Sequence, residues 1–238
     1  MRSKCASHLL FAGLFLVPGG ARSFAGPLPG PLPPLAGPGL ETALRRAAPT
    51  LRREALHAGL LAWSELFSRG ESTRPLLTVI DYGLPSTARR LWVFDLAARR
   101  VLFHTLVAHG RNSGEDLATS FSNEEGSLMT SLGAFVTGAT YLGRNGYSLR
   151  LEGKETGRND HALARTIVVH GAPYVTDSFA RRFGRLGRSW GCPALDPRVA
   201  RPLIDRVKEG SVLYAWHPSL AGAGGGKVPD FHMAPFLD

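Results

Sequence analysis

The chain has 238 residues, a length that suits one or two domains and allows a sizeable hydrophobic core. An apolar share of 44% is ordinary for a soluble protein, whereas 17 Pro and 28 Gly indicate many turns and at least one unstructured stretch. The net charge of +9 favours association with a polyanion, but the basic residues are scattered along the chain and do not by themselves predict a nucleic-acid site.

Residues 1–25 have the layout of a secretory signal peptide. Two basic residues precede a short apolar run over residues 9–17, and small residues then lead to Ala21 and Ala25, after either of which cleavage is expected. The run is too short for a bilayer core that needs about 20 residues. We therefore predict export to the periplasm or the extracellular space, without a membrane span after cleavage. The expected partner is the anionic cell envelope, and no nucleic acid is expected.

The segment after the predicted signal divides into a linker and a helical extension. Residues 26–40 are a Pro/Gly-rich tract, typical of an extended linker. Residues 41–70 are predicted as a helical extension, because apolar residues recur at helical spacing over residues 50–67. For the helix predicted over residues 50–67, Thr50 is the expected N-cap and Gly70 the residue that ends it.

Residues 75–217 are predicted to form the main domain, which is mainly β, and residues 218–238 a flexible tail. Apolar, β-branched runs predict strands over residues 76–81, 90–96, 101–107, 132–141, 148–152, 166–170 and 211–216. The second and third of these read as a hairpin. Helical patterns cover residues 175–182 and 197–209, and Gly210 is the expected C-cap of the latter.

Cys192 is the one cysteine left in the mature chain, since Cys5 lies in the predicted signal. An odd thiol in an oxidising compartment indicates intermolecular pairing or a reactive group. The alternative is a buried, inert cysteine. Gly191 and Pro193 bracket the residue and Ser189 lies nearby, so the segment reads as a polar turn. This context favours a nucleophile.

A thiol with a pKa of about 8.5 is only a few per cent ionised at neutral pH and needs a base. His170 is the candidate, because it ends the predicted strand over residues 166–170 and titrates near neutrality. Either Asp177 or a backbone carbonyl would orient its ring. The amides of Gly191 and Cys192 are candidate donors to an oxyanion.

Ser189 or Arg188 would add a further donor to the oxyanion. No Cys or His at ligand spacing accompanies the cysteine, so neither a metal nor another cofactor is predicted. Two-carboxylate glycoside chemistry stays open, but it would leave the odd thiol unexplained.

At these residues the chain resembles bacterial L,D-transpeptidase catalytic domains, in the murein L,D-transpeptidase branch that carries Gly-Cys-Pro. The resemblance covers about residues 76–216. It rests on several segments in order, namely residues 76–81, 109–114, 121–123, 145–149, 170–171 and 189–193.

The resemblance implies a mainly β fold of the sandwich or barrel type with a cysteine acyl-transfer site. Cys192 would attack the carbonyl of diaminopimelate in a peptidoglycan stem peptide and expel the terminal D-alanine, with His170 as the base. An amine of a neighbouring stem would then release the enzyme. Water in its place would make the protein an L,D-carboxypeptidase or another cysteine hydrolase of cell-wall peptides, and an envelope-binding module without activity is the third alternative.

The chain departs from the better-known branch, which has an arginine two residues after the cysteine where this chain has Ala194. Arg188 is the first candidate to replace its contact with the substrate. The other residues expected to contact the substrate are His109, Ser113, Gly171 and Trp190.

Overall fold

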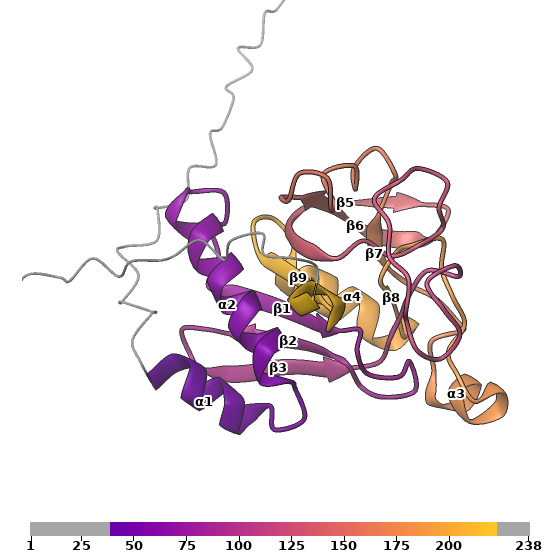
Figure 1. Ribbon diagram of the computed structural model, residues 1–238, viewed down its shortest axis with the longest axis horizontal. Coiled ribbons are helices and arrows are strands. Elements are labelled where there is room, and N and C mark those ends of the chain that lie inside the picture. The colour runs from indigo at the N-terminus through magenta and orange to yellow at the C-terminus, as the bar shows by residue number, and fades with distance from the viewer. Residues whose placement is uncertain (1–38, 223–238) are drawn as a thin grey trace, which may run out of the picture. The chain divides into compact units, whose positions relative to one another are not determined.

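The computed structural model describes residues 39–222 (Figure 1). The predicted signal peptide, nearly all of the predicted linker and residues 223–238 lie outside the described residues. None of the helices between residues 39 and 222 has both the length and the apolar character that crossing a membrane needs.

A nine-stranded sheet forms the body of the described region, with the strand order β3-β2-β1-β9-β5-β6-β7-β8-β4. Its strands are β1 Leu76–Asp81, β2 Leu91–Asp95, β3 Arg100–Thr105, β4 Val107–Ala108, β5 Gly133–Gly143, β6 Gly146–Gly153, β7 Val168–Gly171, β8 Ala194–Leu195 and β9 Val212–Trp216. The strands at the two ends of this order, β3 and β4, are separated in the chain by Leu106 alone. The sheet therefore curves nearly into a barrel, and the fold is mainly β, as predicted.

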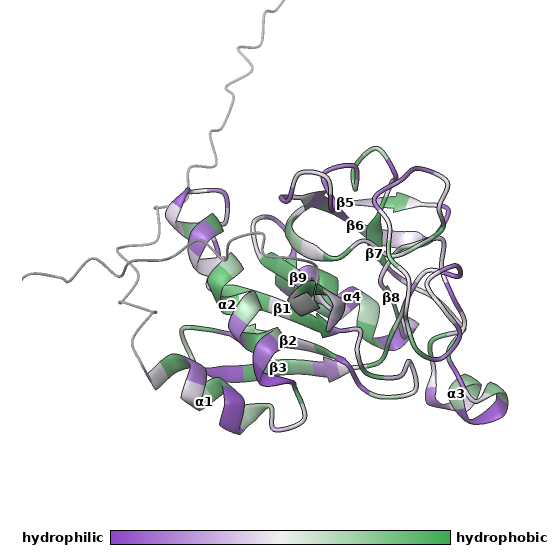
Figure 2. Cartoon of the chain, in the orientation of Figure 1, coloured by the Kyte–Doolittle hydropathy of each residue, from purple (hydrophilic) through white to green (hydrophobic). Residues whose placement is uncertain are grey.

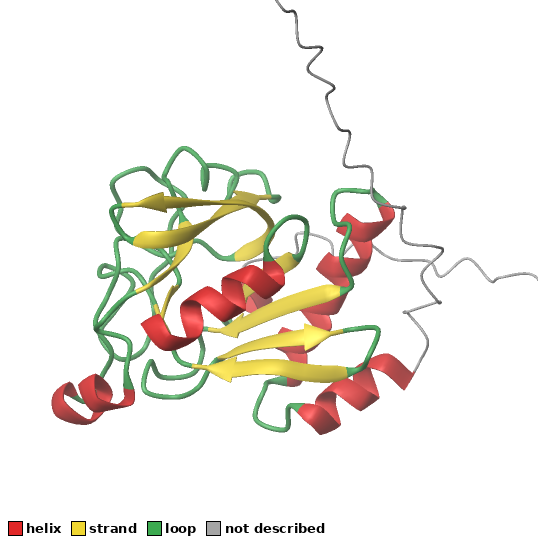
Figure 3. Cartoon of the chain, turned by 180° about the vertical axis from the view of Figure 1, so that it is seen from behind, coloured by secondary structure: helices red, strands yellow, loops and turns green. Residues whose placement is uncertain are grey.

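Five helices accompany the sheet in the described region: α1 Gly39–Ala47, α2 Arg53–Ser68, α3 Asp177–Phe183, α4 Pro197–Val207 and α5 Ser219–Gly222. α2 packs against β1 and β9, and α4 packs against β7 and β6 (Figure 3). In Figure 2 the central strands and the middle of α2 are largely apolar, whereas α3 carries hydrophilic residues.

Alternation along the central strands divides the core into two layers. In β1, Leu77 and Val79 pack with the residues of α1 and α2, whereas Ile80 packs in the layer that includes α4. β9 follows the same rule, since Tyr214 belongs to the first layer and Leu213 to the second. Successive side chains of a strand point to opposite faces. With a helix on each face, these strands are buried throughout.

The predicted cap of α2 was wrong by two residues. The N-cap is Arg52, whose side chain makes no capping bond. Its guanidinium instead donates to Asp81 Oδ1 at 2.8 Å and to the Gly83 carbonyl at 3.3 Å. Buried Leu51 takes up the position before it. This tertiary ion pair, rather than Thr50, therefore fixes where the helix begins.

Two other predicted ends also differ. The C-cap of α4 is Lys208, and Gly210 lies beyond it at φ +97, packed so closely on Thr73 that a Cβ would lie 2.4 Å from the Thr73 hydroxyl oxygen. The predicted flexible tail begins instead with α5. The Ser219 N–H donates to His217 Nδ1 at 3.1 Å and the neighbouring Leu220 packs on the core, so a short helix forms there.

Candidate active site

Cys192 lies in the loop that leads from α3 into β8, and its side chain turns toward β7. The residue is 8% exposed. The Val168 N–H donates to its sulfur at 3.5 Å, and the thiol donates to the Thr166 carbonyl at 3.7 Å. β7 and β8 pair in parallel, with His170 beside Ala194. The strand pairing thus carries the cysteine to the beginning of the histidine strand.

A tight turn around Ser189 shapes the cysteine loop. The buried Ser189 hydroxyl donates to the Cys192 carbonyl at 2.6 Å and accepts the Gly191 N–H at 3.1 Å. Gly191 has φ +123, and a Cβ on it would lie 2.8 Å from the Met129 carbonyl oxygen. Glycine is therefore required at this position. The Gly191 N–H, a candidate donor to the oxyanion, therefore already has a hydrogen-bond partner in Ser189.

A second loop, residues 109–114, lies alongside the cysteine loop. The Ser189 N–H donates to the His109 carbonyl at 3.0 Å, and the Arg111 N–H donates to the Ser189 carbonyl at 2.8 Å. A Cβ on Gly110 would lie 2.9 Å from the Gly191 Cα. The two loops approach this closely because both glycines lack a side chain.

His170 is buried near the end of β7 at 5% exposure. Its Nδ1 lies 3.0 Å from the Gly171 carbonyl oxygen. Since a carbonyl only accepts, Nδ1 carries the proton in this bond. Burial lowers the pKa of His170, so the ring is neutral at pH 7 and Nε2 holds a lone pair. A backbone carbonyl therefore orients the ring, whereas Asp177 forms an ion pair with Arg89 at 3.2 Å.

The imidazole on β7 and the thiol in the loop before β8 make no hydrogen bond with each other in the described region. Val168, which contacts the sulfur, is two residues before His170. Residues two apart in a strand share a face and are separated by roughly 6.6 Å along it. The histidine therefore lies one such step along β7 from the residue whose N–H contacts the sulfur.

His109 is held in the interior, at 1% exposure. The buried guanidinium of Arg90 donates to its Nδ1 at 2.7 Å, so its Nε2–H donates to the Gly114 carbonyl at 3.2 Å. Burial, reinforced by the positive charge of Arg90, lowers the pKa of His109 to about 4. Both ring nitrogens of the neutral histidine are engaged. Only its carbonyl reaches the cysteine loop.

The other residues predicted to contact the substrate have varied surroundings. Ser113 is fully buried and its hydroxyl accepts the Thr130 N–H at 2.9 Å. Gly171 packs on α4, where a Cβ would lie 3.2 Å from the Ala200 Cβ. Arg188 donates to Glu115 Oε1 at 2.6 Å. Trp190, beside the cysteine, is 68% exposed.

Arg165, a residue not predicted from the sequence, is a cation whose charge acts on the thiol. It donates to the Ser122 carbonyl at 2.6 Å and to the Met129 carbonyl at 2.7 Å. A Cβ on Gly191 would lie 3.4 Å from its Nη2. Burial raises the pKa of the Cys192 thiol, and the Val168 amide and the Arg165 charge offset part of that rise. One arginine among 28 basic residues carries no signal of such a role in the sequence.

The electrostatics leave the thiol protonated at neutral pH and the neighbouring imidazole neutral, a pair suited to proton transfer from sulfur to nitrogen. Between residues 39 and 222, no group of three or more His, Cys, Asp or Glu side chains is placed to hold a metal ion.

Comparisons with known proteins give a family and a set of solved structures. The sequence profile of the L,D-transpeptidase catalytic domain matches residues 47–216. A search of curated proteins returns no match. Similar solved structures include an L,D-transpeptidase from Mycobacterium smegmatis, with 16% identity and a TM-score of 0.35 over 59% of this chain and 66% of that one.

Two further structures are similar to a comparable degree. The helical cell shape determining protein Pgp2 from Campylobacter jejuni has 14% identity and a TM-score of 0.37 over 61% of this chain and 45% of that one. L,D-transpeptidase 1 from Mycobacterium tuberculosis has 15% identity and a TM-score of 0.30 over 53% of this chain and 55% of that one. The chain thus spans less than two thirds of the length of these relatives. Because the family profile matches well over half of this chain's residues, the chain belongs to the L,D-transpeptidase catalytic domain family.

Proposed function

We propose that the protein is an exported L,D-transpeptidase that joins peptidoglycan stem peptides through a thioester on Cys192. The observation that supports the proposal is the parallel pairing of β7 with β8, together with the bond from the Val168 N–H, two residues before His170, to the Cys192 sulfur. The Gly171 carbonyl holds the Nδ1 proton of that histidine, so Nε2 is the basic nitrogen. Membership in the family supports the substrate class.

In the acylation step, the Cys192 sulfur attacks the carbonyl that precedes the terminal D-alanine of a donor stem. The thiol proton passes to His170 Nε2, and the carbonyl oxygen becomes an oxyanion. Collapse of this intermediate forms the thioester and breaks the peptide bond. The leaving D-alanine amine takes the proton back from His170. An amine of an acceptor stem then attacks the thioester, which releases Cys192.

The attack requires the thiol to leave its present partner. Its bond to the Thr166 carbonyl is long and involves a weak S–H donor, so losing that bond costs little when the Cys192 side chain turns toward His170. In unliganded enzymes catalytic hydrogen bonds are often loose and tighten only with the substrate bound. We assign the oxyanion to the Cys192 N–H, because the Gly191 amide already donates to Ser189.

Trp190 and Arg188 are the proposed substrate contacts nearest the nucleophile. Ala194, which replaces the arginine of the better-known branch, is fully buried in β8 and cannot reach a ligand. The exposed indole of Trp190 offers an apolar surface to the stem backbone. Arg188 shares its charge with the exposed carboxylate of Glu115, which a stem carboxylate would displace.

The test is incubation of the purified protein with muropeptides that carry tetrapeptide stems, followed by separation and mass analysis of the products. The proposal predicts D-alanine release together with cross-linked dimers, both lost in Cys192→Ala with an unchanged circular dichroism spectrum. Tripeptide product without dimers would instead identify an L,D-carboxypeptidase. Turnover retained in Cys192→Ala would contradict the proposed chemistry, and no product from any stem would favour a binding module.

Export is proposed from residues 1–25, and the division into a helical extension and a main domain from the sequence pattern. Fusion of residues 1–25 to a reporter enzyme that is active only outside the cytoplasm tests the first. Reporter activity that disappears when the apolar run over residues 9–17 is interrupted by two Asp would support export. Activity unaffected by that change would contradict it.

A further inference from the structure

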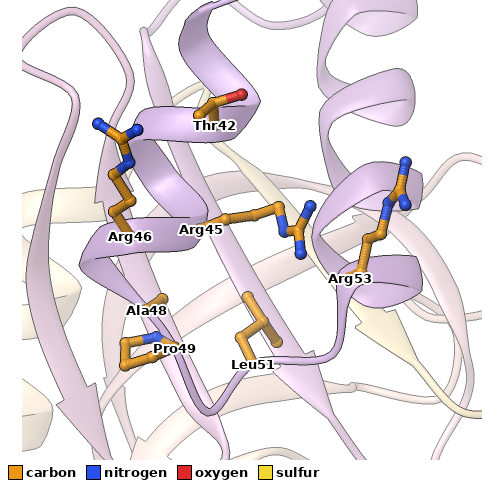
Figure 4. A pocket seen from close by; sticks show the side chains of 7 residues that line it. All are labelled: Thr42, Arg45, Arg46, Ala48, Pro49, Leu51 and Arg53. Carbon is orange, nitrogen blue, oxygen red and sulfur yellow. The ribbon is translucent and has the colours of Figure 1, made fainter.

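The two helices at the beginning of the described region enclose a hollow of about 340 Å³. It is lined by Thr42, Arg45, Arg46, Ala48, Pro49, Leu51 and Arg53 (Figure 4). We call it the α1–α2 hollow. Leu44 at 0% exposure and Leu51 at 8% pack in the core beside it. Thr42, Arg45 and Arg46 precede the family match, which begins at residue 47, so the hollow straddles the beginning of the matched domain.

The charge in the hollow is positive and has no internal partner. Among residues 39–222, no ion pair or hydrogen bond engages the guanidinium groups of Arg45, Arg46 or Arg53, although eight other arginines there have a carboxylate partner. The carboxylate of Glu41, next to Thr42 in the chain, bonds to His57 instead. Three exposed cations thus share one concave site without an anion.

The arrangement of the arginines indicates which anion fits. In Figure 4 the Arg45 side chain reaches from α1 toward α2, on which Arg53 stands, whereas Arg46 lies on the other side of the α1 backbone. A carboxylate has two oxygens, which a single guanidinium satisfies by bidentate bonding. A phosphate carries more charge and offers oxygens in several directions, so guanidinium groups from two facing helices can bind it together.

The hollow is larger than a bare phosphate needs, and its other wall is apolar, made by Ala48, Pro49 and Leu51. We propose that the α1–α2 hollow binds the phosphate of a phosphorylated organic ligand. Arg45 and Arg53 bind the phosphate oxygens, Arg46 adds charge at the rim, and the apolar wall contacts the carbon part. Such a group occurs in soluble phosphate esters and in the headgroups of anionic lipids.

Two binding measurements on the purified protein test the proposal. Calorimetric titration with glycerol 3-phosphate probes the soluble source, and sedimentation with vesicles of phosphatidylglycerol in phosphatidylcholine at about 0.15 M salt probes the lipid source. The variant Arg45→Gln/Arg53→Gln removes two exposed charges from the hollow. The matched control, Arg144→Gln/Arg181→Gln, removes two exposed charges from the β5–β6 turn and α3.

The proposal predicts saturable binding to at least one probe, at least tenfold weaker in the hollow variant and unchanged in the control. Binding to glycerol 3-phosphate alone would identify a soluble ester, and binding to vesicles alone a headgroup held at a surface. Equal loss in both variants would show attraction by net charge only and overturn the proposal, as would no binding to either probe. Because the hollow is separate from Cys192, the hollow variant should retain wild-type turnover of stem peptides.

Discussion

The Cys192 thiol donates to the carbonyl of Thr166 at 3.7 Å, and Thr166 has φ +54, a left-handed conformation that β-branched residues rarely adopt. The turn over residues 159–166 imposes it, because the Thr166 N–H donates to Leu163 and the Ile167 N–H reaches back to Ala162. Strained residues of this kind cost of order 1–3 kcal/mol and persist where the surroundings fix them. Here the carbonyl of the strained residue accepts the hydrogen bond of the proposed nucleophile.

Replacing Thr166 by Gly should stabilise the fold. Glycine adopts the left-handed conformation without the penalty of roughly 1–2 kcal/mol that a Cβ brings, and the exposed Thr166 side chain contributes little packing. The free energy of unfolding in urea should rise by about 1 kcal/mol, reduced by the larger conformational entropy that glycine loses on folding. Thr166→Ala, which keeps the Cβ, should show no such gain. A loss of stability in Thr166→Gly alone would mean that the turn carries no strain.

His170 should set the acid limb of the activity profile. Burial lowers its pKa, so the neutral, basic form persists below the usual value of about 6.5 and is lost only as the pH falls further. The midpoint of kcat/KM against pH should therefore lie below 6.5. His170→Gln should lower kcat/KM by roughly 10²–10⁴-fold with the thermal midpoint nearly unchanged. An unaltered profile in that variant would exclude His170 as the base.

Arg165 should lower the pKa of the Cys192 thiol. Its positive charge opposes the rise in the Cys192 pKa that burial causes, so its removal should raise that pKa further. The rate of alkylation by iodoacetamide, measured against pH, should show a midpoint above about 8.5 in the wild type and a higher one in Arg165→Gln. Arg165→Lys should restore part of the shift. A matched loss of charge at exposed Arg144 should leave the midpoint in place, and a midpoint common to all variants would show that Arg165 only holds its loop.

Ser189→Ala should loosen the cysteine loop. The hydroxyl satisfies both the Cys192 carbonyl and the Gly191 amide in a buried turn. Leaving these groups without partners should cost about 1–3 kcal/mol of unfolding free energy, with kcat falling as the nucleophile loses its position. Ser68→Ala, which removes an exposed hydroxyl bonded to the Glu65 carbonyl, is the control and should be nearly neutral. Full activity in Ser189→Ala would show that the turn does not position the thiol.

Local pattern was enough for most of the strands, but it did not predict β8, and the strand predicted over residues 101–107 is divided into β3 and β4. The bounds of β1 were predicted to the residue, and the hairpin of β2 and β3 was confirmed. The strand bounds and the hairpin follow from short apolar runs between turn residues, a signal that depends only on near neighbours in the chain. The same local logic placed His170 at the end of β7, close to where the cysteine loop joins the sheet.

Long-range contacts account for what the sequence did not reveal. The pattern around His109 does not show that buried Arg90, 19 residues earlier, takes up its Nδ1. Likewise, Arg165 is distinguished from other arginines only by the loop folded over it. The end of α4 was misplaced because the N–H groups of Glu209 and Gly210 donate to carbonyls of the distant strand β5 instead of continuing the helix. Such arrangements depend on tertiary packing, which propensity and spacing do not encode.

The most direct test of the account is intact-protein mass spectrometry after brief exposure to a tetrapeptide stem without an acceptor, followed by peptide mapping. If Cys192 forms the thioester, the protein should gain the mass of the stem acyl group without its terminal D-alanine, located on Cys192 and removed by added acceptor amine. The adduct should be absent from Cys192→Ala and slow to form in His170→Gln. Turnover with an adduct on another residue, or with none at any time of sampling, would contradict a thioester on Cys192.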